Sequence, residues 1–127
     1  MTVAIAFPTA TGLVRVSSGE TMPIAITRGR PSRQLLLQDR PQADSTVIMY
    51  DPDANGGMLH WAFQRLRDGS MKELVPYRGP HPPRGEVHRY YFLVYDGLLK
   101  VPQSRQPFDL QAIAARPDAV AYFKTSR

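Results

Sequence analysis

Apolar residues along the chain fall in short runs that prolines and glycines interrupt. Runs of this kind, rich in β-branched and aromatic residues, are typical of strands, and twelve prolines and nine glycines suit a fold with many connections. The pattern predicts strands over 2–7, 13–16, 24–27, 45–50, 58–66, 88–95 and 119–123. The chain is therefore expected to be mainly β.

Two of these runs alternate with a period of two, which assigns side chains to faces of a sheet. In 58–66, Trp61 and Phe63 alternate with His60, so His60 is expected on the face opposite Trp61. In 88–95 both alternating sets are largely apolar, which predicts a central strand covered on both sides.

The remaining segments give weaker patterns. The polar stretch 28–44 is either a strand or a bare helical turn, and 98–101 could pair back as a hairpin arm. The proline-rich stretch 71–87 is expected to be irregular. Residues 108–116 are the best helix candidate, because Asp109 and Arg116 match the helix dipole and Pro117 ends the segment.

Composition narrows the class of protein. The 127 residues suffice for one domain with a single core, and 43% apolar content fits a globular chain. No apolar run approaches the ~18 residues that a membrane span needs, and 1–14 is expected to form a strand instead of a signal peptide. There is no cysteine, which excludes disulfides and thiolate sites and weakly favours a cytoplasmic location.

The formal charge of +5 raises the question of anionic partners: phosphates, anionic membranes or nucleic acid. The densest basic group, Arg28, Arg30, Arg33 and Arg40, lacks interleaved aromatic residues and matches no nucleic-acid motif. A solvated surface explains it better, so nucleic acid is not an expected partner.

Two stretches carry candidate chemistry. The first, 50–61, places Asp51, Pro52 and Asp53 after a strand, turns through 55–57 and ends at His60 and Trp61. It can be read as a plain turn, since its residues are turn formers, or as a functional acidic loop beside an imidazole. The second runs from Gly79 to Gly85 through Pro80, Pro82 and Pro83, and is followed by His88, Arg89 and Tyr90 opening a strand. Its prolines fix the loop, and its glycines let backbone approach a ligand.

Together these stretches resemble the two signatures of the phosphatidylethanolamine-binding protein family, which includes the Raf kinase inhibitor proteins and plant flowering-time regulators. The resemblance covers about 23–123 and implies a single domain over 1–127, with a central antiparallel β-sheet, a second smaller sheet and one or a few short peripheral helices. It also implies an anion pocket. One wall would be formed by Asp51, Pro52, Asp53 and His60, and the other by Gly79, Pro80, Pro82, Pro83, Gly85, His88 and Tyr90.

The sequence departs from the family pattern in three ways. Asn55 stands where the family usually has a second proline, and a cis bond before it would cost ~2.5–4 kcal/mol, so the loop is expected to differ. The segment 85–88 is one residue longer than the shorter family form. The chain is also shorter than most members, and the closing C-terminal helical extension of the animal proteins is expected to be absent.

The resemblance implies a non-enzymatic binding protein without catalytic residues, metal or cofactor. Its ligand would be a small anion such as phosphate or the phosphatidylethanolamine headgroup, bonded by His88, Tyr90 and a loop N–H. Asp51 or Asp53 would orient an imidazole or meet an ammonium group. A regulatory or scaffolding role, inhibition of a kinase or protease partner, and peripheral contact with an anionic membrane remain open.

The same residues are also compatible with purely structural roles and with other kinds of site. His60 and His88 could be ordinary strand histidines, and Tyr90 could be a core residue or a pocket hydroxyl. Asp51, Asp53, His60 and His88 would suit a metal ion, or an Asp–His pair could activate water for hydrolysis. No metal-binding spacing and no Gly-x-Ser-x-Gly nucleophile motif supports these alternatives.

Overall fold

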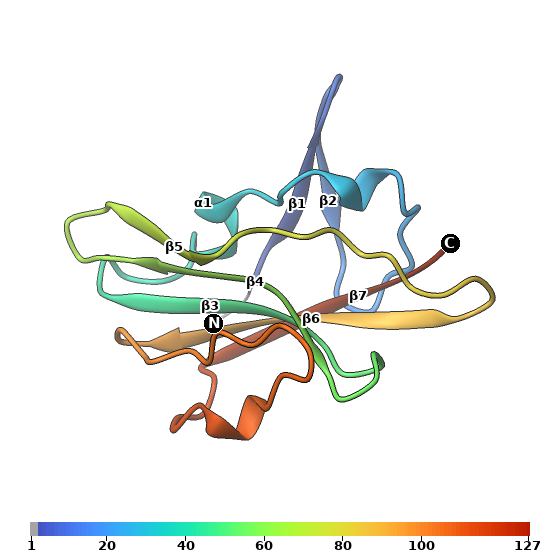
Figure 1. The fold of residues 1–127 in the computed structure, drawn as a ribbon. Helices are drawn as coiled ribbons and strands as arrows, with labels where there is room; N and C mark the ends of the chain where they lie inside the picture. Colours follow the sequence, from blue (N-terminus) through green and yellow to red (C-terminus); the bar gives the residue numbers. More distant parts are fainter. Residues whose placement is uncertain (1–2) are drawn as a thin grey trace.

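A computed structural model of the protein describes residues 3–127. Within them, two antiparallel sheets account for the strands (Figure 1). The smaller sheet is a hairpin of β1 (Ile5–Thr9) and β2 (Gly12–Val16). The larger sheet has the order β5-β4-β3-β6-β7 and consists of β3 (Ser45–Asp51), β4 (Met58–Arg65), β5 (Met71–Val75), β6 (Val87–Asp96) and β7 (Ala119–Ser126).

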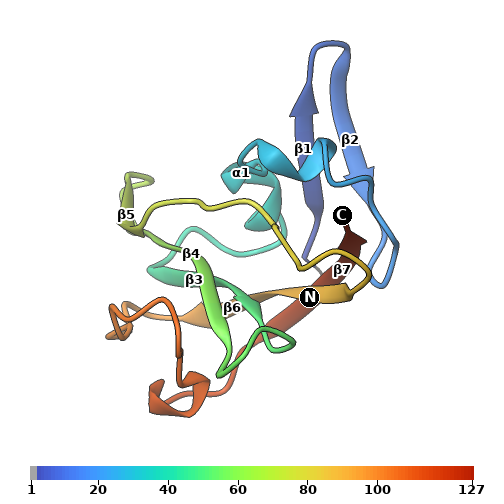
Figure 2. The same ribbon diagram turned by 45° about the vertical axis from the view of Figure 1, so that its right-hand side comes forward.

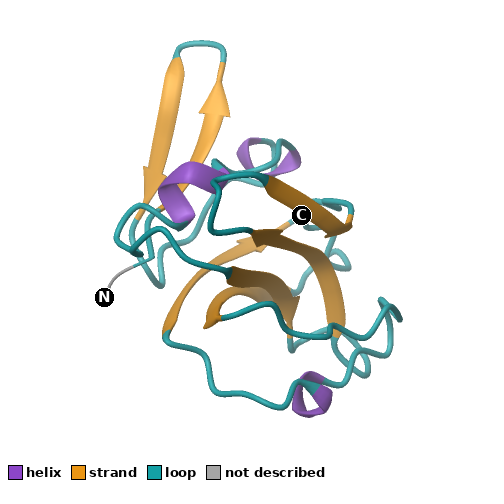
Figure 3. Ribbon diagram, turned by 90° about the vertical axis from the view of Figure 1, so that its left-hand side faces the viewer, coloured by secondary structure: helices purple, strands orange, loops and turns teal. Residues whose placement is uncertain are grey.

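Among the described residues, helical structure is confined to three short turns, which lie at the periphery, as Figure 3 shows. They are η1 (Ile26–Arg28), α1 (Arg33–Leu36) and η2 (Leu110–Ala112). The side chain of Ser32 caps α1 by accepting a hydrogen bond from the Leu35 N–H. A mainly β fold with a central antiparallel sheet, a second smaller sheet and short peripheral helices is therefore confirmed.

The β1–β2 hairpin projects from the body of the protein, and its base is anchored in the core (Figure 2). Phe7 is fully buried, and its ring meets Phe123 of β7 edge-on at a centroid distance of 5.5 Å. The chain after β2 then runs beside β7, where the N–H groups of Gly19 and Met22 donate to carbonyls of that strand. These contacts attach the small sheet to the large one.

Both faces of the large sheet bury apolar side chains. Trp61, Phe63 and Phe92 belong to the layer that also contains the hairpin residues. Leu93 and Tyr95 belong to a second layer on the other face, which Phe108 and Ile113 cover. The prediction that 88–95 is a central strand covered on both sides is confirmed.

Three expected elements are wrong. Residues 24–27 form no strand, because Ile26 and Thr27 donate to the carbonyls of Pro23 and Ile24 in a 3-10 turn. Residues 108–116 contain only η2; the segment lies between two prolines and buries only Phe108 and Ile113, which is too little packing to stabilise a short helix. Residues 98–101 form no hairpin arm, since the Leu99 N–H donates to the Thr46 hydroxyl and its carbonyl accepts from Gln64.

Other boundaries differ less. The stretch 28–44 forms the helical turn α1, which is one of its two expected forms, while β5 lies in a stretch that was expected to be irregular. The first strand begins at Ile5; the part of the expected strand at residue 2 lies outside the described residues. None of the helices within residues 3–127 has the length and apolar character that a membrane span requires.

Candidate functional site

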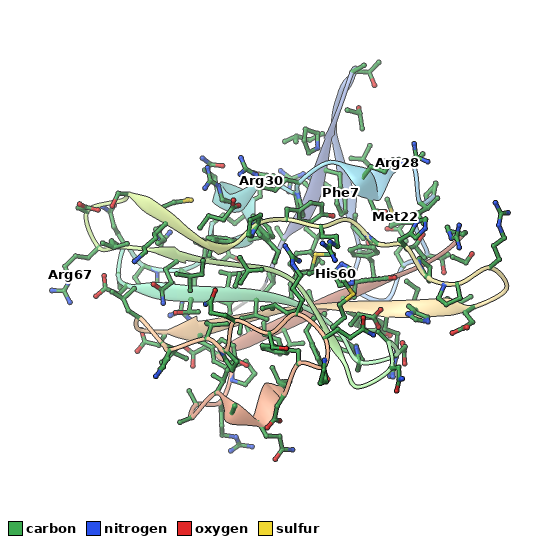
Figure 4. The ribbon with its side chains drawn as sticks, viewed as in Figure 1. Phe7, Met22, Arg28, Arg30, His60 and Arg67 are labelled. Carbon is green, nitrogen blue, oxygen red and sulfur yellow. The ribbon has the colours of Figure 1, made fainter. Side chains whose placement is uncertain are left out.

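A pocket of about 580 Å³ opens where β3 ends, β4 begins and β6 begins. The loop that connects β5 to β6 supplies the remaining wall. Figure 4 shows His60 near the centre of the molecule, whereas Arg67, beyond the far end of β4, projects outward. The lining residues are Asp51, Asp53, Ala54, Asn55, Met58, His60, Arg78, Gly79, His81, Pro82, Pro83, Glu86, His88, Tyr90 and Gln106.

Asp51 has both a structural and a chemical role. One carboxylate oxygen, Oδ1, accepts hydrogen bonds from the N–H groups of Asp53 at 2.8 Å and Ala54 at 3.2 Å, which closes the turn after β3. The other oxygen, Oδ2, accepts from Nδ1 of His88 at 2.8 Å. Asp51 is only 2% exposed, so this carboxylate is a fixed part of the pocket floor.

His88 lies between two carboxylates. Its Nδ1 contacts Asp51, and its Nε2 contacts Oε1 of Glu86 at 2.9 Å. Burial lowers the pKa of His88, but the hydrogen bonds to Glu86 and Asp51 outweigh burial and raise the pKa above its ordinary value. The ring is therefore favoured as an imidazolium that donates from both nitrogens, and it has no free lone pair with which to act as a general base.

His60 is held in the opposite state. Its Nδ1 lies 2.7 Å from the carbonyl oxygen of Arg78, so Nδ1 carries the proton. Burial dominates and lowers the pKa of His60, which keeps the ring neutral. Its Nε2 is buried and has no hydrogen-bond partner among residues 3–127. A buried lone pair in a pocket wall is thus available to a donor on a ligand.

The predicted position of His60 relative to Trp61 is wrong. In the β3–β4 register Met49 pairs with Trp61 and Tyr50 with Leu59, so His60 is the extra residue of a bulge in β4. Leu59 consequently joins the second core layer with Ala62. The His60 ring instead meets Tyr90 edge-on at 5.2 Å, and Tyr90 belongs to the same layer as Trp61. An extra residue in a strand breaks strict alternation, and here it turns the imidazole into the pocket.

Asp53 forms an ion pair instead of orienting an imidazole. Its Oδ2 accepts from the N–H of Arg89 at 2.8 Å and from Nε at 3.0 Å, and its Oδ1 accepts from Nη2 at 2.8 Å. The side-chain bonds from Arg89 lower the pKa of Asp53. Arg89 was not a candidate site residue, although it lies in the His88–Arg89–Tyr90 run; its alternation to the face opposite His88 gave no sign that it closes the acidic loop.

The structure brings most of the predicted site residues to one pocket. Asp51, Asp53, His60, Gly79, Pro82, Pro83, His88 and Tyr90 line it. Pro52, Pro80 and Gly85 do not: the first two line neighbouring hollows, and Gly85 is exposed in the turn before β6. Tyr90 combines both of its expected roles, since it is buried against Phe123 and also lines the pocket. A ligand-binding role for these residues stays a prediction.

Sequence reasoning missed residues that complete or position the pocket. Arg78, His81 and Glu86 add charged or titratable groups to its lining. Arg105 donates from its guanidinium to the carbonyls of Leu59, His60 and Pro76, and so ties β4 to the loop after β5. No local signal marks Arg105, because its partners are backbone groups that lie far away in sequence.

The loop around Asn55 is closed by a hydrogen bond and two glycines. The one cis peptide bond within residues 3–127 joins Gln106 to Pro107, so the bond before Asn55 is trans. The Asn55 carbonyl accepts a hydrogen bond from Nε2 of Gln106 at 3.0 Å. Gly56 and Gly57 have φ of 76°, a conformation that suits glycine, and they complete the turn.

The donor arrangement does not favour a metal centre. In the described part of the chain, no group of three or more His, Asp or Glu side chains is placed to hold a metal ion. The four residues considered for such a site are instead paired: Asp53 with Arg89, His88 with Asp51 and Glu86, and His60 with a carbonyl.

The fold and the pocket together define a mainly β protein with a polar pocket at one end of its central sheet. Residues 14–125 match the sequence model of the family described as phosphatidylethanolamine-binding protein. The chain belongs to this family. A crystal structure described as a phosphatidylethanolamine-binding protein homologue from Chlamydia trachomatis superposes with a TM-score of 0.55, at 20% identity, over 98% of each chain. At that identity the likeness bears on the fold alone.

Proposed function

We propose that this protein is a non-enzymatic binding protein whose pocket holds the phosphate group of a small ligand, such as a phosphatidylethanolamine headgroup. One observation carries the proposal: Asp51 holds a buried imidazole, His88, as a donor, and its Nε2 already contacts an anionic oxygen. Family membership supports a binding role in general.

The pocket offers complementary chemistry to a phosphate. His88 would donate from Nε2, and Arg78 supplies a second positive charge to the lining. Hydrogen bonds to charged groups contribute about 1.5–3 kcal/mol each. The Tyr90 hydroxyl keeps its proton, because burial raises its pKa. Tyr90 would therefore act as a neutral donor.

His60 sets a requirement on the ligand. Its neutral ring presents a lone pair at Nε2, and a fully ionised phosphate oxygen would be repelled there. The site therefore favours a ligand that brings a donor, such as a P–OH or an ammonium group; otherwise His60 must take up a proton on binding. In a regulatory role, including inhibition of a kinase or protease, scaffolding or contact with an anionic membrane, this pocket would bind the ligand and carry out no chemistry on it.

An NMR titration with phosphorylethanolamine tests the proposal. Saturable shifts of the imidazole signals of both His60 and His88 are expected, with ethanolamine alone as the matched control lacking phosphate. The variant H88N should lose most of the affinity, because Asn cannot supply the positive charge. If neither imidazole responds at millimolar ligand, or if H88N binds as well as the wild type, the pocket does not bind phosphate.

A further inference from the structure

Glu86 contacts Nε2, the nitrogen of His88 that is not bonded to Asp51. It follows Gly85, whose φ of 85° makes the turn, and its N–H donates to the carbonyl of Pro83 at 3.1 Å. The turn places the carboxylate so that Oε1 lies 2.9 Å from Nε2 of His88. The side chain of Glu86 is 56% exposed, whereas that of His88 is 6% exposed. An exposed carboxylate on the pocket rim thus covers a buried donor.

This contact marks where an anionic oxygen binds. We propose that Glu86 is a built-in competitor of the pocket: its carboxylate takes the position of the ligand's anionic group on His88, and it must leave before a phosphate can bind there. This inference rests on the proposed function, and it adds a residue of this chain that sets the affinity of that site.

The Glu86 carboxylate can move away from His88, whereas the Asp51 carboxylate is held in place. Asp51 is 2% exposed, and its two oxygens accept three hydrogen bonds, two of which close the loop. The backbone of Glu86 is held in its turn, but its side chain has His88 as its one ion-pair partner within residues 3–127. Rotation of its side chain would place the carboxylate in solvent, while His88 keeps its bond to Asp51.

Two properties of Glu86 determine how strongly it competes with a ligand: its side chain is exposed, and the chain attaches it close to His88. A half-exposed ion pair is weak, so the contact opens readily. A tethered group nevertheless acts at an effective concentration in the millimolar range, and it occupies the donor for a large share of the time. Because only the open fraction binds, the apparent Kd rises by the inverse of that fraction. Removal of Glu86 should therefore tighten anion binding by about threefold to tenfold.

The experiment compares E86A and E86Q with the wild type, using inorganic phosphate at constant ionic strength and following the imidazole nitrogens of His88. The measurements are made at about pH 5, below the ordinary histidine pKa of about 6.5, and the nitrogen signals themselves show in each variant whether His88 is protonated. D68N is the matched control, since Asp68 also carries one negative charge but lies beyond the opposite end of β4, in the exposed turn before β5. We expect E86A to bind phosphate about threefold to tenfold more tightly, E86Q to fall between, and D68N to match the wild type.

The possible outcomes distinguish the proposed competition by Glu86 from the proposed phosphate binding. If the wild type binds phosphate and E86A binds equally or more weakly, Glu86 is not a competitor and the proposed function stands. The proposed competition is also contradicted if D68N gains as much phosphate affinity as E86A, because the change in net charge would then explain the gain. Binding by E86A alone would support the competitor and show that Glu86 closes the wild-type pocket. If no variant binds phosphate, both proposals are wrong.

Discussion

At the scale of single residues, the two pocket histidines differ in what faces each ring nitrogen. His88 has a carboxylate oxygen on both sides, so its charged form is favoured. His60 has a carbonyl on Nδ1 and nothing on Nε2 within the described residues, and its burial favours the neutral form. The two rings both contact Tyr90, with centroid distances of 6.5 Å for His88 and 5.2 Å for His60. One aromatic side chain thus separates a donor from an acceptor.

These states predict opposite effects of pH on stability. The raised pKa of His88 stabilises the fold fully below the ordinary histidine value of about 6.5, and this contribution is lost as pH rises through the folded-state pKa. The lowered pKa of His60 has the reverse effect: below about pH 6.5 the unfolded chain binds more protons, so stability falls as the solution becomes more acidic.

Denaturant unfolding of H88N and H60N between about pH 5 and pH 8 tests this assignment. The loss of stability in H88N should be largest near pH 5–6 and shrink toward about pH 8. The loss in H60N should instead shrink as pH falls from about 7 to about 5. Two losses with the same slope against pH would contradict a charged His88 beside a neutral His60.

Sequence reasoning reached some residue roles and not others. Asp51 and Asp53 look equivalent around Pro52 in the sequence, but the structure gives one to His88 and the other to Arg89. Their difference depends on which partner strand lies beside each carboxylate, and no local pattern contains that information. Glu86 is a different case: it lies only two positions before His88, a spacing that places two side chains on one face of a strand, so a local signal for this contact was present.

At the scale of elements, the wall of the pocket formed by 78–83 depends on close backbone contact with the segment around η1. A Cβ added to Gly79 would lie 3.0 Å from the carbonyl oxygen of Thr27. That oxygen already accepts a hydrogen bond of 2.7 Å from the Tyr77 hydroxyl. Glycine at position 79 therefore sets how far the wall stands from the neighbouring loop.

The substitution G79A should push the wall away and cost about 1–3 kcal/mol of stability, as overpacking usually does. It should also weaken phosphorylethanolamine binding. G29A is the matched control, because Gly29 has extended backbone and an added Cβ would meet nothing within 4 Å. It should be neutral or stabilise the fold by about 0.4–1 kcal/mol. Denaturant midpoints and NMR titrations measure both effects, and equal behaviour of the two variants would contradict this role for Gly79.

Elements were predictable where periodicity and burial agree. In β6 each face packs on its own core layer, so alternation assigned its side chains correctly. In β4 a bulge redirects His60, and bulges leave little trace in a hydrophobic pattern. The segment 108–116 has good helix formers, but intrinsic propensity is a weak prior, and a short helix needs tertiary packing that this segment lacks.

At the scale of the whole molecule, the pocket unites segments that are far apart in the chain. Asp51 ends β3, His60 lies in β4, His88 opens β6 and Gln106 comes from the loop before η2. Arg105, from the same loop as Gln106, holds β4 and the loop after β5 together through backbone carbonyls. The two signature stretches allowed the sequence to predict that its candidate residues meet, while the Arg105 bridge required the full topology.

Because the net charge is +5, the final prediction needs a control for general binding of anions to the basic surface. A basic protein gains stability from any anion at low salt, so a phosphate effect counts only at constant ionic strength. Under that condition, phosphate at about a hundred times its Kd should stabilise the fold by about 2.7 kcal/mol. For a chain of this size that is a rise in Tm of about 10 °C.

H88N separates the pocket from general charge effects. The variant retains every arginine and lysine of the chain, so it should show the same response to chloride as the wild type. It should lose most of the phosphate-dependent rise in Tm, because the donor fixed by Asp51 is gone. If H88N and the wild type rise equally with phosphate, the stabilising anions bind to the basic surface and the pocket has no part in the effect.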